Sequence, residues 1–143
     1  MPTVQRSALV PYSAQAMYEL VSAIDSYPEF LPWCAAACIE EQTEHTQLAS
    51  VSIDAKFQQT TFSTRNSLVP GQEIQMTLDD GPFKHLFGVW RFKALGDHGC
   101  RVQLDVDFEF KSTALAALIG PAFSKICDSI VNAFVARAHE TLS

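Results

Sequence analysis

The strongest constraint on the fold is a change of hydrophobic period that begins after residue 110. Before it, polar and apolar residues alternate, and the apolar positions are Val102, Leu104, Val106, Phe108 and Phe110. A period of two is typical of a strand with one buried face and one solvated face. After it, apolar residues recur at helical spacing from Ile119 to Phe134. The chain therefore has to bury one face of a sheet against one face of a long helix.

The rest of the chain predicts further strands and one short helix. Residues 4–10 are typical of a first strand, and Ser13 is placed to cap a helix that we expect to end near Asp25. Further alternating segments follow residue 34, and one of them includes Ala49 to Phe57. Turn residues separate these segments at positions 70–71, 79–82 and 96–99, the last of which includes His98.

This order predicts one α+β domain over residues 1–143. Tight turns between about six successive strands indicate an antiparallel meander. The economical arrangement is a bent antiparallel β-sheet wrapped around the long C-terminal α-helix, because each element then hides its apolar face on the other. We expect such a grip to leave an apolar cavity. Gly120 and Pro121 are expected to divide the last helical pattern into a short helix and a long one.

Residues 26–34 combine two prolines with three aromatic side chains, Tyr27, Phe30 and Trp33. Proline fixes φ and discourages continuation of a helix, so the segment is predicted to be a stiffened connection that displays these rings. Two interpretations remain open at this point. The rings either form the entrance for a ligand or close one end of the core as a hydrophobic plug.

Composition excludes several classes of function. The net charge is −6 and the ten basic residues are scattered, which disfavours DNA and other polyanions as partners. The four cysteines lack CxxC spacing, and Cys34 and Cys38 lack a second ligand pair, so neither a disulfide scaffold nor a metal site is expected. The first residues have no signal-peptide core, which favours the cytoplasm.

One apolar stretch, residues 112–124, is flanked by Lys111 and Lys125. It is shorter than the roughly 20 residues that span a bilayer. We expect it either to touch the surface of the inner membrane or to cap the cavity.

Three segments carry a family resemblance: residues 27–34, residues 80–92 and residues 134–138. Together they resemble the bacterial RatA proteins and the related mitochondrial coenzyme Q-binding proteins, within the START-like, or polyketide cyclase and lipid transport, superfamily. The resemblance covers the chain from Val4 to its C-terminus. It implies a helix-grip fold with an apolar tunnel. In the quinone-associated members it implies binding of ubiquinone in support of respiration. In the RatA members it implies a toxin that binds the large ribosomal subunit and blocks subunit joining.

An apolar tunnel suits an isoprenoid because burying apolar surface contributes about 25 cal/mol per Å². We expect Phe30 and Trp33 at the entrance, and the lining to comprise Phe62, Trp90, Phe108, Ile119, Phe123, Ile126 and Ile130. For each of them the alternative is ordinary core packing. The polar candidates for a quinone head group are Arg65, Asn66, Lys84 and His85. In a regular strand Arg65 faces away from Phe62, which lies three positions earlier.

No catalytic motif is evident, because no histidine lies in an HExxH or Ser-His-Asp arrangement. The favoured hypothesis is therefore a non-catalytic carrier of a hydrophobic isoprenoid, with ubiquinone as ligand and no cofactor. A second hypothesis is a ribosome-binding regulator, which requires Lys84, Arg91, Lys93 and Arg101 to gather on one surface. A third is a cyclase-like enzyme, which requires a buried ionisable residue with a polar partner in the cavity.

Overall fold

The computed structural model describes residues 3–55, 58–97 and 99–142. Phe57 and His98, which were assigned above to a strand and a turn, lie outside these ranges. The strands are β1 (Thr3–Val10), β2 (Cys34–Gln42), β3 (Thr46–Ala55), β4 (Gln58–Val69), β5 (Glu73–Asp80), β6 (Phe83–Leu95) and β7 (Gly99–Phe110). The helices are α1 (Ala14–Ser22), the 3-10 helix η1 (Ile24–Glu29) and α2 (Thr113–Thr141).

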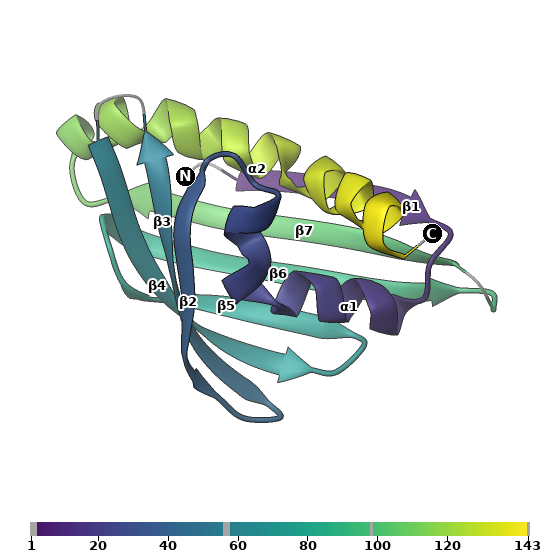
Figure 1. The fold of residues 1–143 in the computed structure, drawn as a ribbon. Coiled ribbons are helices and arrows are strands. Elements are labelled where there is room, and N and C mark those ends of the chain that lie inside the picture. The colour runs from purple at the N-terminus through teal and green to yellow at the C-terminus, as the bar shows by residue number, and fades with distance from the viewer. Residues whose placement is uncertain (1–2, 56–57, 98, 143) are drawn as a thin grey trace.

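The strands form one antiparallel sheet in the order β1-β7-β6-β5-β4-β3-β2. Strands β2 to β7 follow one another as a meander, and β1 closes the order by pairing with β7. Two of the predicted turns use glycines in the left-handed region, Gly71 at φ 74° and Gly96 at φ 69°. Strands β2 to β4 run steeply across the direction of β5 to β7, so the sheet is strongly bent (Figure 1). The predicted fold is confirmed.

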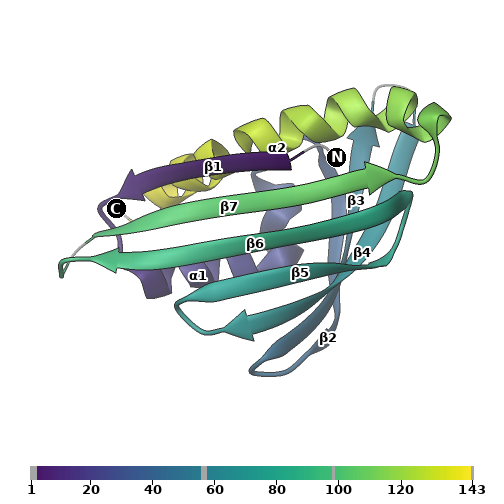
Figure 2. The same ribbon diagram turned by 180° about the vertical axis from the view of Figure 1, so that it is seen from behind.

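Helix α2 lies along the inner side of this bend (Figure 1). In the view from behind it follows the edge of the sheet formed by β1 and β7 and lies partly behind β1 (Figure 2). Its first turn is capped by Ser112, whose side chain accepts a hydrogen bond from the Leu115 N–H over 3.1 Å. Its buried stripe comprises Ile119, Phe123, Ile126, Cys127, Val131, Phe134 and Ala138. By length and composition α2 could cross a membrane, a test that the core helix of a soluble protein also passes.

The predicted break at Gly120 and Pro121 is wrong, because α2 runs through both residues. Pro121 is exposed and removes one backbone donor from the helix. Ile119 before it and Phe123 after it are both buried on the same stripe. Packing of that stripe outweighs the lost hydrogen bond, since most helix stability in proteins comes from tertiary contacts.

The connection after α1 also differs from the expectation. Helix α1 ends at Ser22, and residues 24–29 form the 3-10 helix η1, with Pro28 inside it. The Tyr27 carbonyl accepts hydrogen bonds from the N–H groups of Phe30, at 3.2 Å, and Leu31, at 3.0 Å. The fixed φ of proline is compatible with a helical turn. The first half of the aromatic segment is therefore helical, and only residues 30–33 form a connection.

Candidate ligand-binding cavity

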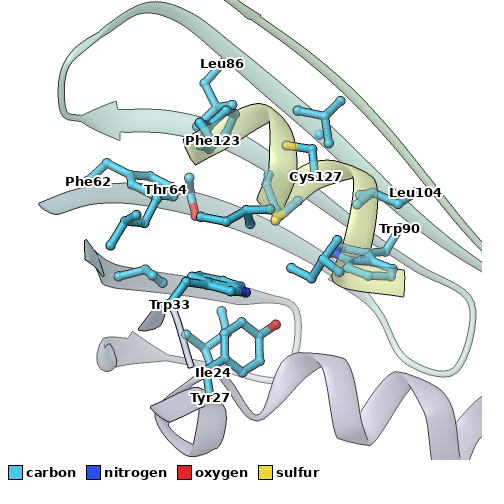
Figure 3. A pocket seen from close by; sticks show the side chains of 17 residues that line it. Ile24, Tyr27, Trp33, Phe62, Thr64, Leu86, Trp90, Leu104, Phe123 and Cys127 are labelled. Carbon is cyan, nitrogen blue, oxygen red and sulfur yellow. The ribbon is translucent and has the colours of Figure 1, made fainter. Parts of the chain in front are cut away.

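An apolar cavity of about 110 Å³ lies between the inner face of the sheet, η1 and the middle of α2 (Figure 3). It is lined by 17 residues, which come from η1, the residue before β2, strands β3 to β7 and α2. The alternation along the strands brings these side chains inward, and the stripe on α2 closes the opposite side. None of the 17 is a carboxylate, lysine, arginine or histidine.

Aromatic packing fixes both ends of the cavity. At one end Phe123 packs on Phe108, with 4.7 Å between ring centroids, and on Phe83, at 5.0 Å. At the other end Phe134 packs on Tyr27 at 5.3 Å and on Trp90 at 5.4 Å. Edge-to-face pairs of this kind resist rearrangement because close-packed interiors transmit strain. The packing of these two aromatic groups therefore holds the cavity between them open.

Six of the nine predicted site residues line this cavity: Trp33, Phe62, Trp90, Phe123, Ile126 and Ile130. Phe108 and Ile119 are buried but lie outside the lining, since they pack in the aromatic end around Phe123 and on the inner stripe of α2. Phe30 also lies outside it and packs on Phe134 at 5.3 Å. As ligand-binding residues all nine stay predictions.

The segment 26–34 fulfils two structural roles. Glu29 and Phe30 fasten it to α2, because the Arg137 guanidinium pairs with the Glu29 carboxylate at 3.0 Å and lies 4.9 Å from the Phe30 ring centroid. Tyr27 and Trp33 instead face the cavity. The plug interpretation thus describes Phe30, whereas Trp33 is part of the cavity wall.

None of the four predicted polar candidates lines the cavity. Arg65 is on the other face of β4 from Phe62, as expected. Its guanidinium pairs with Asp79 at 3.2 Å, and 65% of its side chain is exposed. Lys84 is exposed and pairs with Glu109 at 3.7 Å. His85 is half-buried. The third hypothesis, a cyclase-like enzyme, required an ionisable residue inside the cavity beside a polar partner. Arg65, Lys84 and His85 do not meet this requirement.

The fourth candidate, Asn66, is buried, but its amide belongs to a hydrogen-bonded chain behind the wall. The Thr64 hydroxyl donates to Asn66 Oδ1 at 2.8 Å, and Asn66 Nδ2 donates to Gln47 Oε1 at 2.8 Å. Gln47 Nε2 then donates to the Ser22 carbonyl at 2.9 Å. We call this set, Thr64, Asn66, Gln47 and the Ser22 carbonyl, the amide relay. Its end at Thr64 reaches the cavity.

Several lining residues were missed from the sequence. Thr64 follows Phe62 by two positions, so the strand period would have placed both on one face. Gly88 lies inside β6, where a glycine often marks close approach. A Cβ atom there would lie 2.7 Å from Met76 Cε, the flexible end of another lining side chain. A glycine within the alternation of β6 was the available signal.

Two titratable side chains line the cavity, and burial keeps both protonated. Burial, with a smaller contribution from the neighbouring Asp128, raises the pKa of Cys127 to about 12, although Arg6 opposes the shift. Burial also raises the pKa of Tyr27, whose hydroxyl donates to the Val21 carbonyl. The cavity is therefore electrically neutral at physiological pH. Among the described residues, no cluster of three or more His, Cys, Asp or Glu could hold a metal ion.

Comparison with known proteins identifies relatives over most of the chain. The family model described as polyketide cyclase / dehydrase and lipid transport matches residues 10–135. The ribosome association toxin RatA of Pseudomonas aeruginosa is 43% identical over 137 residues, which cover 96% of this chain and 95% of that protein. The mitochondrial coenzyme Q-binding protein of Drosophila melanogaster is 29% identical over 134 residues, 91% of this chain and 55% of its own length.

Solved structures show the same fold at low sequence identity. A START superfamily protein from Mycobacterium smegmatis has a TM-score of 0.76 and 19% identity, and the match covers 96% of this chain and 97% of that one. The Zhui aromatase/cyclase from Streptomyces has a TM-score of 0.81 and 19% identity, with 99% and 96% covered. The fold is therefore a START-like helix grip.

Proposed function

Because the chain belongs to the polyketide cyclase / dehydrase and lipid transport family, we propose that it is a non-catalytic carrier of a hydrophobic isoprenoid ligand, with ubiquinone as the principal candidate. The observation that carries this proposal is the apolar cavity, whose 17 lining residues include none with a charged side chain at neutral pH. The name of the Drosophila relative, a coenzyme Q-binding protein, supports the choice of ligand.

The size of the cavity limits which part of the ligand it takes. Its volume is about 110 Å³, comparable with engineered cavities of about 150 Å³ that hold one benzene ring. Typical ligand pockets are larger, at roughly 300–1,000 Å³. We therefore assign the cavity to a ring-sized head group. The tail continues outward past Trp33, Val51 and Ile130, lining side chains that are half-buried.

Intrinsic fluorescence tests this proposal, because both tryptophans of the chain, Trp33 and Trp90, line the cavity. We expect a short-chain ubiquinone to quench their emission saturably with one site per chain. Gly88→Ala, which pushes Met76 within the cavity, should weaken binding about tenfold, an effect of about 1.4 kcal/mol, with little change in the free energy of unfolding.

The matched control is Ala94→Val, which adds methyl groups at an exposed position of the same strand. It should leave the affinity unchanged. Quenching that does not saturate, or equal affinities for the wild type and Gly88→Ala, would contradict binding in this cavity.

We place the carrier in the cytoplasm with transient contact to the inner membrane. The first turns of α2 support the membrane contact, because Ala114, Ala117 and Leu118 are exposed there between Lys111 and Lys125. Apolar side chains beside lysines are typical of helices that touch anionic lipid surfaces. Such contact would allow a lipid to enter and leave the protein.

A second proposed function is association with the large ribosomal subunit and interference with subunit joining. The observation that favours it is the 43% identity to the ribosome association toxin RatA of Pseudomonas aeruginosa over 96% of this chain. Lys84 and Arg91 are paired with acidic side chains. Lys93 and Arg101 are cross-strand neighbours on β6 and β7, and neither has an ion pair within the described part of the chain. They are the basic site we propose for contact with rRNA.

Sucrose gradients of ribosomes test this second function. Overproduction of the wild type should lower the amount of joined ribosomes, and the double variant Lys93→Glu, Arg101→Glu should not, because like charges repel the phosphates. Gly88→Ala serves as the control with an intact surface. If overproduction of the wild type leaves joined ribosomes unchanged, the second function is excluded.

A further inference from the structure

Thr64 carries one of the two hydroxyl groups on a wall that is otherwise almost apolar. The other polar atoms on lining side chains are the indole nitrogens of Trp33 and Trp90, the Cys127 thiol and the Tyr27 hydroxyl, which is bonded to the Val21 carbonyl. Figure 3 shows the Thr64 oxygen and the two indole nitrogens among the lining side chains. These groups decide which head group the cavity accepts.

The direction of the amide relay is fixed at its far end. A backbone carbonyl only accepts hydrogen bonds, so the side-chain nitrogen of Gln47 must face the Ser22 carbonyl, 2.9 Å away. Gln47 Oε1 then faces Asn66 and requires its nitrogen, at 2.8 Å. This leaves Asn66 Oδ1 toward Thr64, whose hydroxyl hydrogen is committed to it at 2.8 Å.

A second anchor holds the same direction. Gln42 Nε2 donates to the Thr43 carbonyl at 2.7 Å, so Gln42 Oε1 faces Gln47 and accepts from its nitrogen at 3.0 Å. Reversing the relay would bring two oxygens together at Ser22 and two more at Gln42. Thr64, Asn66 and Gln47 are 7%, 3% and 3% exposed, so bulk water cannot compensate for lost bonds.

With its hydrogen committed, Thr64 Oγ1 offers only lone pairs to the cavity. The indole N–H groups of Trp33 and Trp90 offer hydrogen-bond donors. Neither has a hydrogen-bond partner among the residues that the structure describes. A ligand hydroxyl satisfies both kinds of group, since it donates to Thr64 and accepts from an indole. A carbonyl or an ether oxygen only accepts.

We infer that the cavity selects a head group that donates a hydrogen bond, a phenol or a quinol, over the matching quinone or methyl ether. The inference rests on the proposed function, because it specifies the head group that the same cavity takes. Thr64 can turn its hydrogen toward a carbonyl only by leaving Asn66 Oδ1 without a donor inside the protein. We expect this to reduce affinity about tenfold.

A redox-inert pair of probes tests the inference. Tryptophan fluorescence is titrated with 4-ethylphenol and with 4-ethylanisole, its methyl ether. The wild type should bind the phenol about tenfold more tightly. Thr64→Val has nearly the same shape without the oxygen and should reduce this ratio to about one. Thr64→Ser, which restores a hydroxyl, should recover the preference.

Thr60→Val is the matched control, because Thr60 is buried on the same face of β4 but does not line the cavity. It should keep the preference of the wild type. Equal affinities for the two probes in the wild type overturn the inference whether or not the variants fold, and so does an unchanged ratio in a folded Thr64→Val protein. In both cases the binding of apolar ligands still stands. If neither probe changes the fluorescence but a short-chain ubiquinone still quenches it, the inference fails alone. If the ubiquinone does not quench it either, the proposed function fails together with the inference.

Discussion

At the scale of single residues, two threonines on one face of β4 differ in what their hydroxyls contact. Thr64 donates to Asn66, whereas Thr60 Oγ1 is buried with no partner among the described residues. Burying a hydroxyl without a hydrogen bond costs about 1–3 kcal/mol. Thr60→Val should therefore raise the free energy of unfolding by about 1 kcal/mol, and Thr64→Val should lower it by a similar amount. Urea denaturation measures both, and a change of the same sign in the two variants would contradict the assignment.

Cys127 predicts how stability depends on pH. In the unfolded chain its thiol ionises near the ordinary pKa of 9.0, whereas in the folded protein burial raises the pKa to about 12. The folded state holds the proton more tightly, so this contribution is fully present below pH 9 and is lost as the pH rises toward 12. The free energy of unfolding should fall across this interval.

Cys127→Ala tests the source of that alkaline loss. The variant should show a shallower fall in the free energy of unfolding between about pH 9 and pH 11. Cys38→Ala, at an exposed position, should keep the slope of the wild type. Identical slopes for the wild type and Cys127→Ala would show that other groups cause the loss.

At the scale of elements, the connection between η1 and β2 contains one residue that we expect to affect stability and another that we expect to affect ligand binding. Phe30 packs on Phe134 and beneath Arg137, while Trp33 lines the cavity. Phe30→Ala should lower the free energy of unfolding by about 1–3 kcal/mol, less than a fully buried phenylalanine, and leave the affinity for a short-chain ubiquinone nearly unchanged. Trp33→Ala should weaken that affinity at least tenfold.

The two substitutions are compared by urea denaturation and by quenching of Trp90, the tryptophan that remains in Trp33→Ala. Arg65→Ala is a surface control, because it removes an exposed ion pair with Asp79 that is expected to contribute little. If Phe30→Ala weakens binding more than Trp33→Ala does, the cavity is not where the ligand binds.

The elements were largely predictable from the sequence because each has a strong local signal. The alternation from Val102 to Phe110 and the helical period from Ile119 to Phe134 each follow from one buried face. The breaks were harder to predict. Pro121 remains inside α2 because the residues around it are buried, and Pro28 lies within a 3-10 helix because its φ suits one. Local proline rules do not include the tertiary contacts that keep Pro121 inside α2.

The site was predictable only in part, for a related reason. Large apolar residues on inward faces identify candidates for a wall, but not which of them leave space. Phe108 and Ile119 have the same pattern as Phe123 and Ile126, yet only the latter pair lines the cavity. The amide relay also depends on tertiary structure, because β3 packs beside β4 and near the end of α1. This packing brings Gln47 to Asn66 and to the Ser22 carbonyl.

At the scale of the whole molecule, a bent sheet around one helix leaves a space that neither element alone defines. The aromatic pairs around Phe123 and around Phe134 form the two ends of this space. The outer face of the sheet meets solvent, and there Arg91 lies between Glu73 and Asp105. The two proposed functions thus concern different surfaces, the inner cavity and the Lys93 and Arg101 site, and variants can separate them.

The central claim is that the cavity holds the ring head group of an isoprenoid quinone. Native mass spectrometry of the protein purified from a quinone-containing bacterium tests it most directly. The account predicts a complex with one ligand per chain whose organic extract contains ubiquinone or ubiquinol, and a lower occupancy in Gly88→Ala than in Ala94→Val. Protein that is consistently free of ligand and does not bind added quinone or quinol would contradict the claim.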